Sequence, residues 1–188
     1  MPDEGTPRIE PLPEDEWDAE LRTLIDQSWS GPPPGNRNNL YRTLARHRLL
    51  FRTWSELGRV LLNSRLPARD RELLILRTAW LTRCRFEWAY HEPLALRVGI
   101  SQAEIRRVLS GPDAPGWDER DATLVGAVDE LVSGATLADA TWDRLLAWYD
   151  EQQLIEIPAI VGQYQLVAYL TNAIRIQPHG HLPVLPES

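Results

Sequence analysis

The chain has 188 residues, of which 43% are apolar and 25% are charged, and its formal net charge is −7. This is the composition of a globular protein with one compact domain or two very small ones, not of a disordered chain. All 20 basic residues are arginine. The absence of lysine excludes Schiff-base enzymes, pyridoxal-phosphate enzymes and P-loop nucleotide hydrolases. The acidic balance also argues against nucleic-acid binding, which needs concentrated positive charge.

The apolar segments are short and the cysteine content is minimal. Runs such as Leu73–Leu76 end after a few residues, so we expect no membrane-spanning segment, no membrane partner and no secretory signal. The one cysteine, Cys84, allows neither an internal disulfide nor a multi-cysteine zinc site. With no export signal, the expected location is the cytoplasm.

The order of elements is predicted from proline, glycine and apolar spacing. Residues 1–13 contain four prolines and are expected to form an extended arm, followed by a single helical domain over 14–176 and a Pro-rich tail over 177–188. Apolar residues recur at helical spacing in eight segments: 14–29, 40–62 with a break near His47, 67–83, 84–98, 101–109, 118–133, 139–150 and 153–175.

Proline and glycine interrupt this pattern at two places. The segment Gly31–Gly35 is expected to end the first helix, and Pro93 is expected to kink or break the fourth. No segment alternates apolar and polar residues long enough to predict a strand. The sequence therefore predicts an all-α protein.

One stretch combines residues that can carry chemistry. Cys84, Glu87 and His91 are spaced i, i+3 and i+7, which places a thiol, a carboxylate and an imidazole on one stripe of a helix. Glu72 lies on the preceding predicted helix and enters the same pocket if the two helices pack antiparallel. Carboxylates beside an imidazole favour the imidazolium, and such a pair can move protons near neutral pH.

The same residues also have a purely structural interpretation, which spacing alone favours about equally. Glu87 and His91 would then be an ordinary i, i+4 surface pair. Cys84 would be a small buried hydrophobic residue, and Glu72 would only favour the dipole of its helix.

The stretch resembles the carboxymuconolactone decarboxylase and alkylhydroperoxidase D-like superfamily. The reductase branch of that superfamily carries Glu, eleven residues, then Cys-x-x-Cys-x-x-x-His. Glu72, Cys84 and His91 match the Glu, the first Cys and the His, while Glu87 replaces the second Cys. Further short segments resemble those of the longer family members that are named as decarboxylases: RTLARH (42–47), LPARDRELLILR (66–77), EWAYH (87–91), DEL (129–131) and QQLIEI (152–157). The resemblance extends from about residue 37 to 175.

The resemblance implies an alkylhydroperoxidase D-like helical bundle that assembles into a homo-oligomer, a dimer, trimer or hexamer, with its pocket near subunit contacts. It implies a lyase that acts on a small carbonyl or carboxylate substrate, most simply by decarboxylation of a carboxymuconolactone-like molecule or keto acid. His91 would donate the proton, Glu87 would orient the ring, and Glu72 would hold a second proton or the substrate. No metal and no organic cofactor is expected, because the substrate supplies its own electron sink.

Peroxide reduction is the second interpretation. With a single cysteine, the two-thiol cycle through a disulfide is excluded, so Cys84 would need an external thiol. A carboxylate at Glu87 also disfavours the thiolate, although a helix N-terminus favours it.

Other interpretations stay open at this point. The same residues suit an isomerase, a dehydratase, a lactone hydrolase or a non-catalytic interaction module. A metal site formed by Glu72, Glu87 and His91 is chemically possible but is not implied by the resemblance. The His179–His181 segment is expected to be part of the tail rather than a metal site.

Aromatic residues flank the candidate site. Trp80, Trp88 and Tyr90 are predicted to line the substrate pocket, with Tyr90 adding a phenol donor there or at a subunit contact and Trp88 packing away from the carboxylate. The apolar segment around Tyr164 is a candidate helix that lines the pocket or joins subunits.

Overall fold

The computed structural model describes residues 6–28 and 38–187. Within them the chain forms nine α-helices, one short 3-10 helix and no strand, which confirms the all-α prediction. The chain divides into two compact units, residues 1–63 with 169–182 and residues 64–168 with 183–188. None of the described helices is both long enough and apolar enough to cross a membrane.

The first unit contains the N-terminal helices and the end of the last helix. Its elements are η1 (Glu14–Glu16), α1 (Ala19–Asp26), α2 (Asn39–Leu44), α3 (Arg48–Leu62) and the last residues of α9 (Glu151–Ile174). Residues 6–13 are not helical, and the Arg8 N–H donates to the Ile174 carbonyl at 2.8 Å.

The first predicted helix is interrupted in the structure. Trp17 has an extended backbone, and Asp18 caps α1 by accepting the Leu21 N–H at 2.9 Å, so the acidic segment before it forms only η1. Trp29 and the predicted stop at Gly31–Gly35 lie outside the described residues.

The predicted break near His47 is confirmed. The His47 Nδ1 accepts the Leu50 N–H at 3.3 Å and so caps α3.

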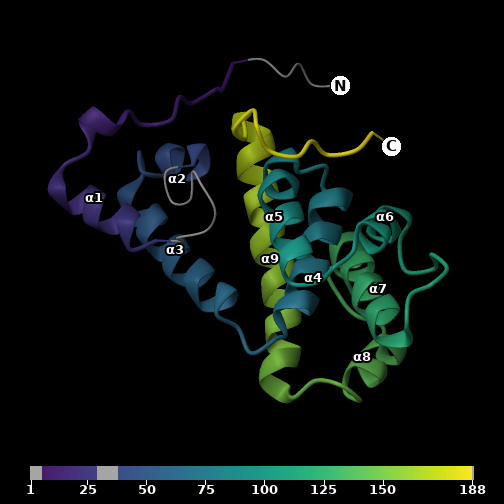
Figure 1. The fold of residues 1–188 in the computed structure, drawn as a ribbon. Coiled ribbons are helices and arrows are strands. Elements are labelled where there is room, and N and C mark those ends of the chain that lie inside the picture. The colour runs from purple at the N-terminus through teal and green to yellow at the C-terminus, as the bar shows by residue number, and fades with distance from the viewer. Residues whose placement is uncertain (1–5, 29–37, 188) are drawn as a thin grey trace. The chain divides into compact units, whose positions relative to one another are not determined.

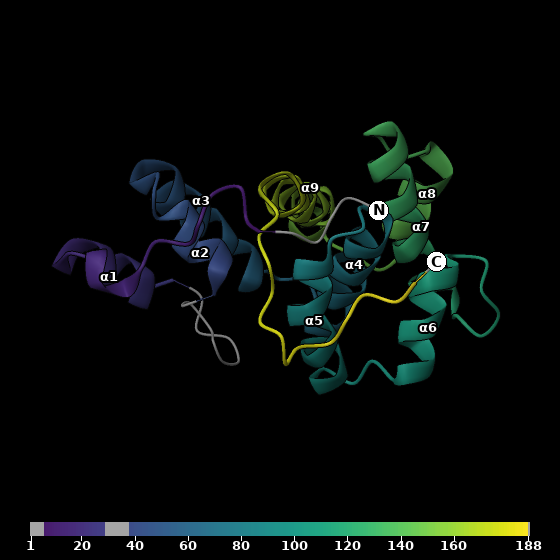
Figure 2. The ribbon, with the colours of Figure 1, turned by 90° about the horizontal axis from the view of Figure 1, so that it is seen from above.

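The second unit is built around α4. Its helices are α4 (Ala68–Leu81), α5 (Arg85–Arg97), α6 (Gln102–Ser110), α7 (Glu119–Gly134), α8 (Asp139–Leu145) and α9 as far as Ala168. Most side chains of α4 are buried, and α4 packs against α5, α6 and α7. Figures 1 and 2 both show α4 between α5 and α7. A residue on α4 is therefore surrounded by protein on several sides.

The predicted helices of this unit are found close to their expected limits, with two differences. Of the kink or break expected at Pro93, the break does not occur: α5 continues through this residue, because packing against α4 outweighs the one backbone hydrogen bond that proline cannot make. α8 ends at Leu145, five residues earlier than predicted. The capping box of Ser101 and Glu104 at the start of α6 is present in full.

Partly buried ion pairs connect α4 to its neighbours. Arg77 makes a two-pronged contact with Asp129 of α7 at 2.7 and 2.8 Å and donates to the Val108 carbonyl at the end of α6 at 2.6 Å. Arg69 pairs with Asp121 at the start of α7. These contacts fix the position of α4, which carries Glu72 of the candidate site.

Candidate active site

A tight connection between α4 and α5 forms the frame of the site. Arg83 adopts a left-handed backbone conformation (φ 53°), and the Cys84 N–H donates to the Ala79 carbonyl at 2.8 Å. The Arg83 guanidinium stacks over the Trp80 ring, 4.4 Å from its centroid. The connection turns the chain so that α5 packs against α4, as the sequence analysis required for Glu72 to enter the pocket.

Cys84 has a structural role at the start of α5. It is the N-cap residue, and its Sγ accepts the Glu87 N–H at 3.5 Å. Its side chain is completely buried. Sulfur is a weak acceptor compared with the oxygens that usually cap helices, so this is a modest contribution to the helix end.

The two predicted carboxylates hold both ring nitrogens of His91. The Nδ1 lies 2.8 Å from Glu72 Oε2, and the Nε2 lies 3.2 Å from Glu87 Oε2. All three side chains are buried, with exposed fractions of 3% for Glu72, 5% for His91 and 8% for Glu87. Glu87 and His91 are therefore not a solvent-exposed helix pair, and Glu72 joins them from α4.

The charges of this Glu72–His91–Glu87 cluster favour an imidazolium. Burial alone lowers the pKa of His91, but Glu72 raises it by its charge and its hydrogen bond, and Glu87 adds to the effect. The net result is a pKa of about 10. At neutral pH both ring nitrogens are therefore protonated, and each donates to a carboxylate.

Tyr164 of α9 contacts His91, whereas the sequence predicted only that the helix around Tyr164 lines the pocket or joins subunits. Its ring meets the His91 ring edge to face, with centroids 5.0 Å apart and planes at 90°. The only signal in the sequence was the apolar periodicity of its segment, which does not specify the residue that meets the histidine.

The three predicted substrate-binding aromatic residues have identifiable contacts in the structure. Trp88 is buried, donates to Glu92 Oε2 at 3.0 Å and lies 6.4 Å from Trp80 between ring centroids. Tyr90 is buried against Phe86, with ring centroids 4.8 Å apart. Their part in substrate binding stays a prediction.

The described residues do not form a metal site. Across residues 6–28 and 38–187, no group of three or more histidine, cysteine, aspartate and glutamate side chains is arranged to hold a metal ion. In the cluster itself, both nitrogens of His91 are already engaged by carboxylates. The geometry suits proton transfer.

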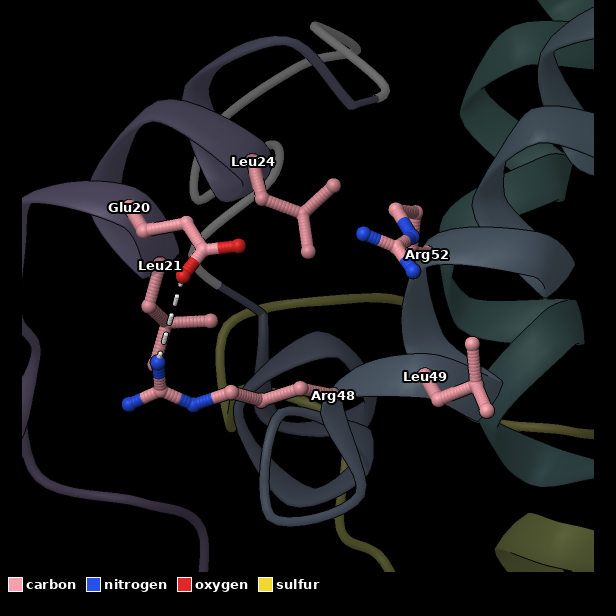
Figure 3. A pocket seen from close by; sticks show the side chains of 6 residues that line it. All are labelled: Glu20, Leu21, Leu24, Arg48, Leu49 and Arg52. Atoms are coloured by element: carbon pink, nitrogen blue, oxygen red, sulfur yellow. Dashed lines mark ion pairs between the residues drawn. The ribbon is translucent and has the colours of Figure 1, made fainter.

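Two surface hollows are lined by residues other than those of the cluster. One, of about 230 Å³, lies between α1 and α3 and is lined by Glu20, Leu21, Leu24, Arg48, Leu49 and Arg52. Figure 3 shows the Arg48–Glu20 ion pair at its edge, 4.0 Å long. The other, of about 440 Å³, lies at the ends of α7 and α8 and includes Trp142 and Pro158.

The comparison with protein families found a match to one family. Residues 48–130 match the model of the carboxymuconolactone decarboxylase family. This match confirms the resemblance seen in the motifs of the chain. The matched segment contains Cys84 and the whole Glu72–His91–Glu87 cluster.

Solved structures with the same fold include two that are named for AhpD. An uncharacterised peroxidase-related protein from Ralstonia eutropha JMP134, described as an alkylhydroperoxidase AhpD core, matches with a TM-score of 0.76 at 16% identity, covering 94% of this chain and 95% of that one. The debrominase Bmp8 matches with a TM-score of 0.73 at 16% identity and 92% coverage of both chains. A protein of unknown function from Agrobacterium tumefaciens, named for the antioxidant defence protein AhpD, matches with a TM-score of 0.67 at 21% identity, covering 76% of this chain and 96% of that one.

At these identities the similarity shows the fold alone. The comparison with curated proteins gave no match.

We predict that the unfolding free energy of the wild type falls between pH 8 and 10, and that the His91→Gln variant lacks this fall. The pKa of His91 is raised from 6.5 to about 10 in the folded protein, so the folded state holds a proton that the unfolded chain releases. This stabilisation is complete below about pH 6.5 and is lost as the pH rises through about 10, at up to about 1.4 kcal/mol per pH unit. Urea unfolding followed by tryptophan fluorescence measures how the unfolding free energy changes with pH in each protein. The same change in both proteins would contradict the raised pKa of His91.

Proposed function

We propose that the protein is a cofactor-independent lyase that moves a proton next to a substrate carbonyl, most simply in a decarboxylation. The observation that carries this proposal is the buried imidazole held at both nitrogens by carboxylates, at 2.8 and 3.2 Å. The family match over residues 48–130 supports it, because the matched segment contains these three residues.

The two carboxylates have different roles in the proposed mechanism. Glu72 makes the shorter contact, on Nδ1, and is the more buried of the two, so we assign the orientation of the ring to Glu72 and not, as the sequence first suggested, to Glu87. Glu87 makes the longer contact, on Nε2, and is the one that a substrate group displaces. The Nε2–H is then directed at the substrate while Glu72 keeps the imidazole in place.

The proposed step is balanced without a redox partner. The bond between the carboxylate carbon and the neighbouring carbon breaks, CO₂ leaves, and the electron pair moves into the carbonyl to form an enolate. His91 Nε2 gives its proton to the enolate carbon, and one proton from water restores the imidazolium. The positive ring also stabilises the negative charge that develops in the transition state.

The raised pKa of His91 fits this sequence of events. At a pKa of about 10, the resting imidazolium is a weak acid at neutral pH. Glu87 is one of the groups that raise this pKa, so displacing its carboxylate lowers the pKa and makes the ring a better proton donor. Substrate binding thus activates the donor.

The same cluster suits other reactions that begin with proton transfer beside a carbonyl. Isomerisation, dehydration and lactone hydrolysis remain alternatives, and release of CO₂ distinguishes decarboxylation from all three. We also propose that the substrate is a small carbonyl or carboxylate compound and that the enzyme is a homo-oligomer in the cytoplasm.

We predict that the purified protein consumes γ-carboxymuconolactone with release of CO₂, and that His91→Ala lowers kcat/KM by about 100-fold or more, the usual range for removing a proton donor. The matched control is His181→Ala, which removes an exposed imidazole from the C-terminal segment. Ultraviolet absorbance follows the substrate, and circular dichroism checks that each variant is folded. A folded His91→Ala protein with wild-type turnover would overturn the assignment, and a wild type that releases no CO₂ would exclude this decarboxylation.

Thiol chemistry at Cys84 is the second candidate function. The observation in its favour is the position of Sγ at the N-terminus of α5, where it accepts the Glu87 N–H at 3.5 Å. Two structural neighbours are named for peroxidases or AhpD, and the debrominase Bmp8 was also solved as a cysteine-to-alanine variant with 2,3,4-tribromopyrrole. Against it, Cys84 is completely buried and the sequence holds no second cysteine.

We predict that Cys84→Ala keeps γ-carboxymuconolactone turnover within about tenfold of the wild type, because the thiol caps the start of α5 and takes no part in the proposed proton transfer. The same variant is assayed with hydrogen peroxide and dithiothreitol. Loss of a wild-type peroxidase activity in Cys84→Ala, together with no turnover of the lactone by either protein, would establish the second candidate instead.

A further inference from the structure

Arg71 extends the charged cluster by one residue. Its Nε lies 3.7 Å from Glu72 Oε1, the carboxylate oxygen that His91 does not use. With both glutamates ionised and His91 protonated, the Arg71 charge makes the sum of the four groups zero. Glu72 thus lies between two cations, one on each oxygen.

The guanidinium of Arg71 is incompletely satisfied. Its Nε–H is buried and makes no hydrogen bond within the described part of the chain. The distance to Glu72 is beyond hydrogen-bond range, so it is an ion pair only. A buried donor on a charged group is energetically costly to leave without a partner.

Arg71 is also the member of the cluster nearest to solvent. Its side chain is 15% exposed, more than those of Glu72, Glu87 and His91. Of the four side chains, that of Arg71 is therefore the most accessible to a ligand from solvent. Arginine offers planar, two-pronged donors that match a carboxylate better than any other side chain.

We propose that Arg71 is the residue that recognises a carboxylate of the substrate, an inference that rests on the proposed function. The bound carboxylate is not the one that leaves. An ion pair with the leaving carboxylate would hold its negative charge in place and so oppose its conversion to neutral CO₂. Arg71 binds a carboxylate that remains in the product, and that group positions the reacting carbon beside His91.

The test separates binding from turnover by using a ligand that does not react. The probe is 2-furoate, a planar five-membered-ring acid, and its neutral partner is 2-furamide, which has nearly the same shape. Isothermal titration calorimetry measures the affinity of both for the wild type, Arg71→Gln and Arg71→Lys. Arg106→Gln is the matched control, because it makes the same charge change at an exposed position of α6.

The wild type and Arg106→Gln are expected to bind 2-furoate at least tenfold more tightly than 2-furamide. Arg71→Gln is expected to lose that preference while keeping its affinity for 2-furamide, and Arg71→Lys to lose part of it. If Arg71→Gln does not fold, Arg71→Lys carries the test. A wild type without the preference, or a folded Arg71 variant with unchanged affinity for 2-furoate, would overturn the inference.

Kinetics on γ-carboxymuconolactone then separates this inference from the proposed function. Arg71→Lys is expected to raise KM with kcat changed by less than about threefold, as for a group that contributes to binding. Turnover that does not depend on Arg71 would overturn the recognition role alone. A carboxylate preference without any turnover would overturn the proposed reaction but not the binding site.

Discussion

The burial of an imidazole between two carboxylates is the constraint on which the site depends. Moving one charged group out of water is costly unless an opposite charge and hydrogen bonds compensate for it. Here the compensation is mutual, because Glu72 and Glu87 occupy the two nitrogens of His91. Losing His91 leaves two buried carboxylates without their shared counter-charge, and losing either glutamate leaves one ring nitrogen of His91 without its partner. The helices α4 and α5 must therefore keep both glutamates within hydrogen-bond distance of His91.

The helical unit maintains this register through α4. α4 packs against three neighbouring helices and is tied to α7 by the Arg77–Asp129 contact. α5 follows after a connection that requires Arg83 in a left-handed conformation, at a cost of order 1–2 kcal/mol. The result is a fixed distance between Glu72 on one helix and His91 on the next, which suits acid–base chemistry because proton transfer depends steeply on distance.

Much of this site was predictable from the sequence, and the rest depends on packing between distant segments. The i, i+4 spacing alone brings Glu87 to His91, since both lie on one helix face. Glu72 required a further assumption, that two consecutive helices pack against each other. Tyr164 was not assigned, because helical periodicity in α9 does not reveal which of its faces meets the histidine. The sequence correctly predicted that a helix begins near Cys84. That the Cys84 thiol caps this helix depends on the backbone conformation at Cys84, which the sequence did not reveal.

The most direct test is nitrogen-15 NMR of the His91 side chain in histidine-labelled protein, assigned by comparison with His91→Gln. The account predicts that both ring nitrogens are protonated at pH 7 and that the resonances titrate near pH 10, far above the ordinary value of 6.5. A neutral ring at pH 7, or titration near 6.5, would show that the carboxylates do not hold the imidazole as described. It would also remove the basis for its activation by displacement of Glu87.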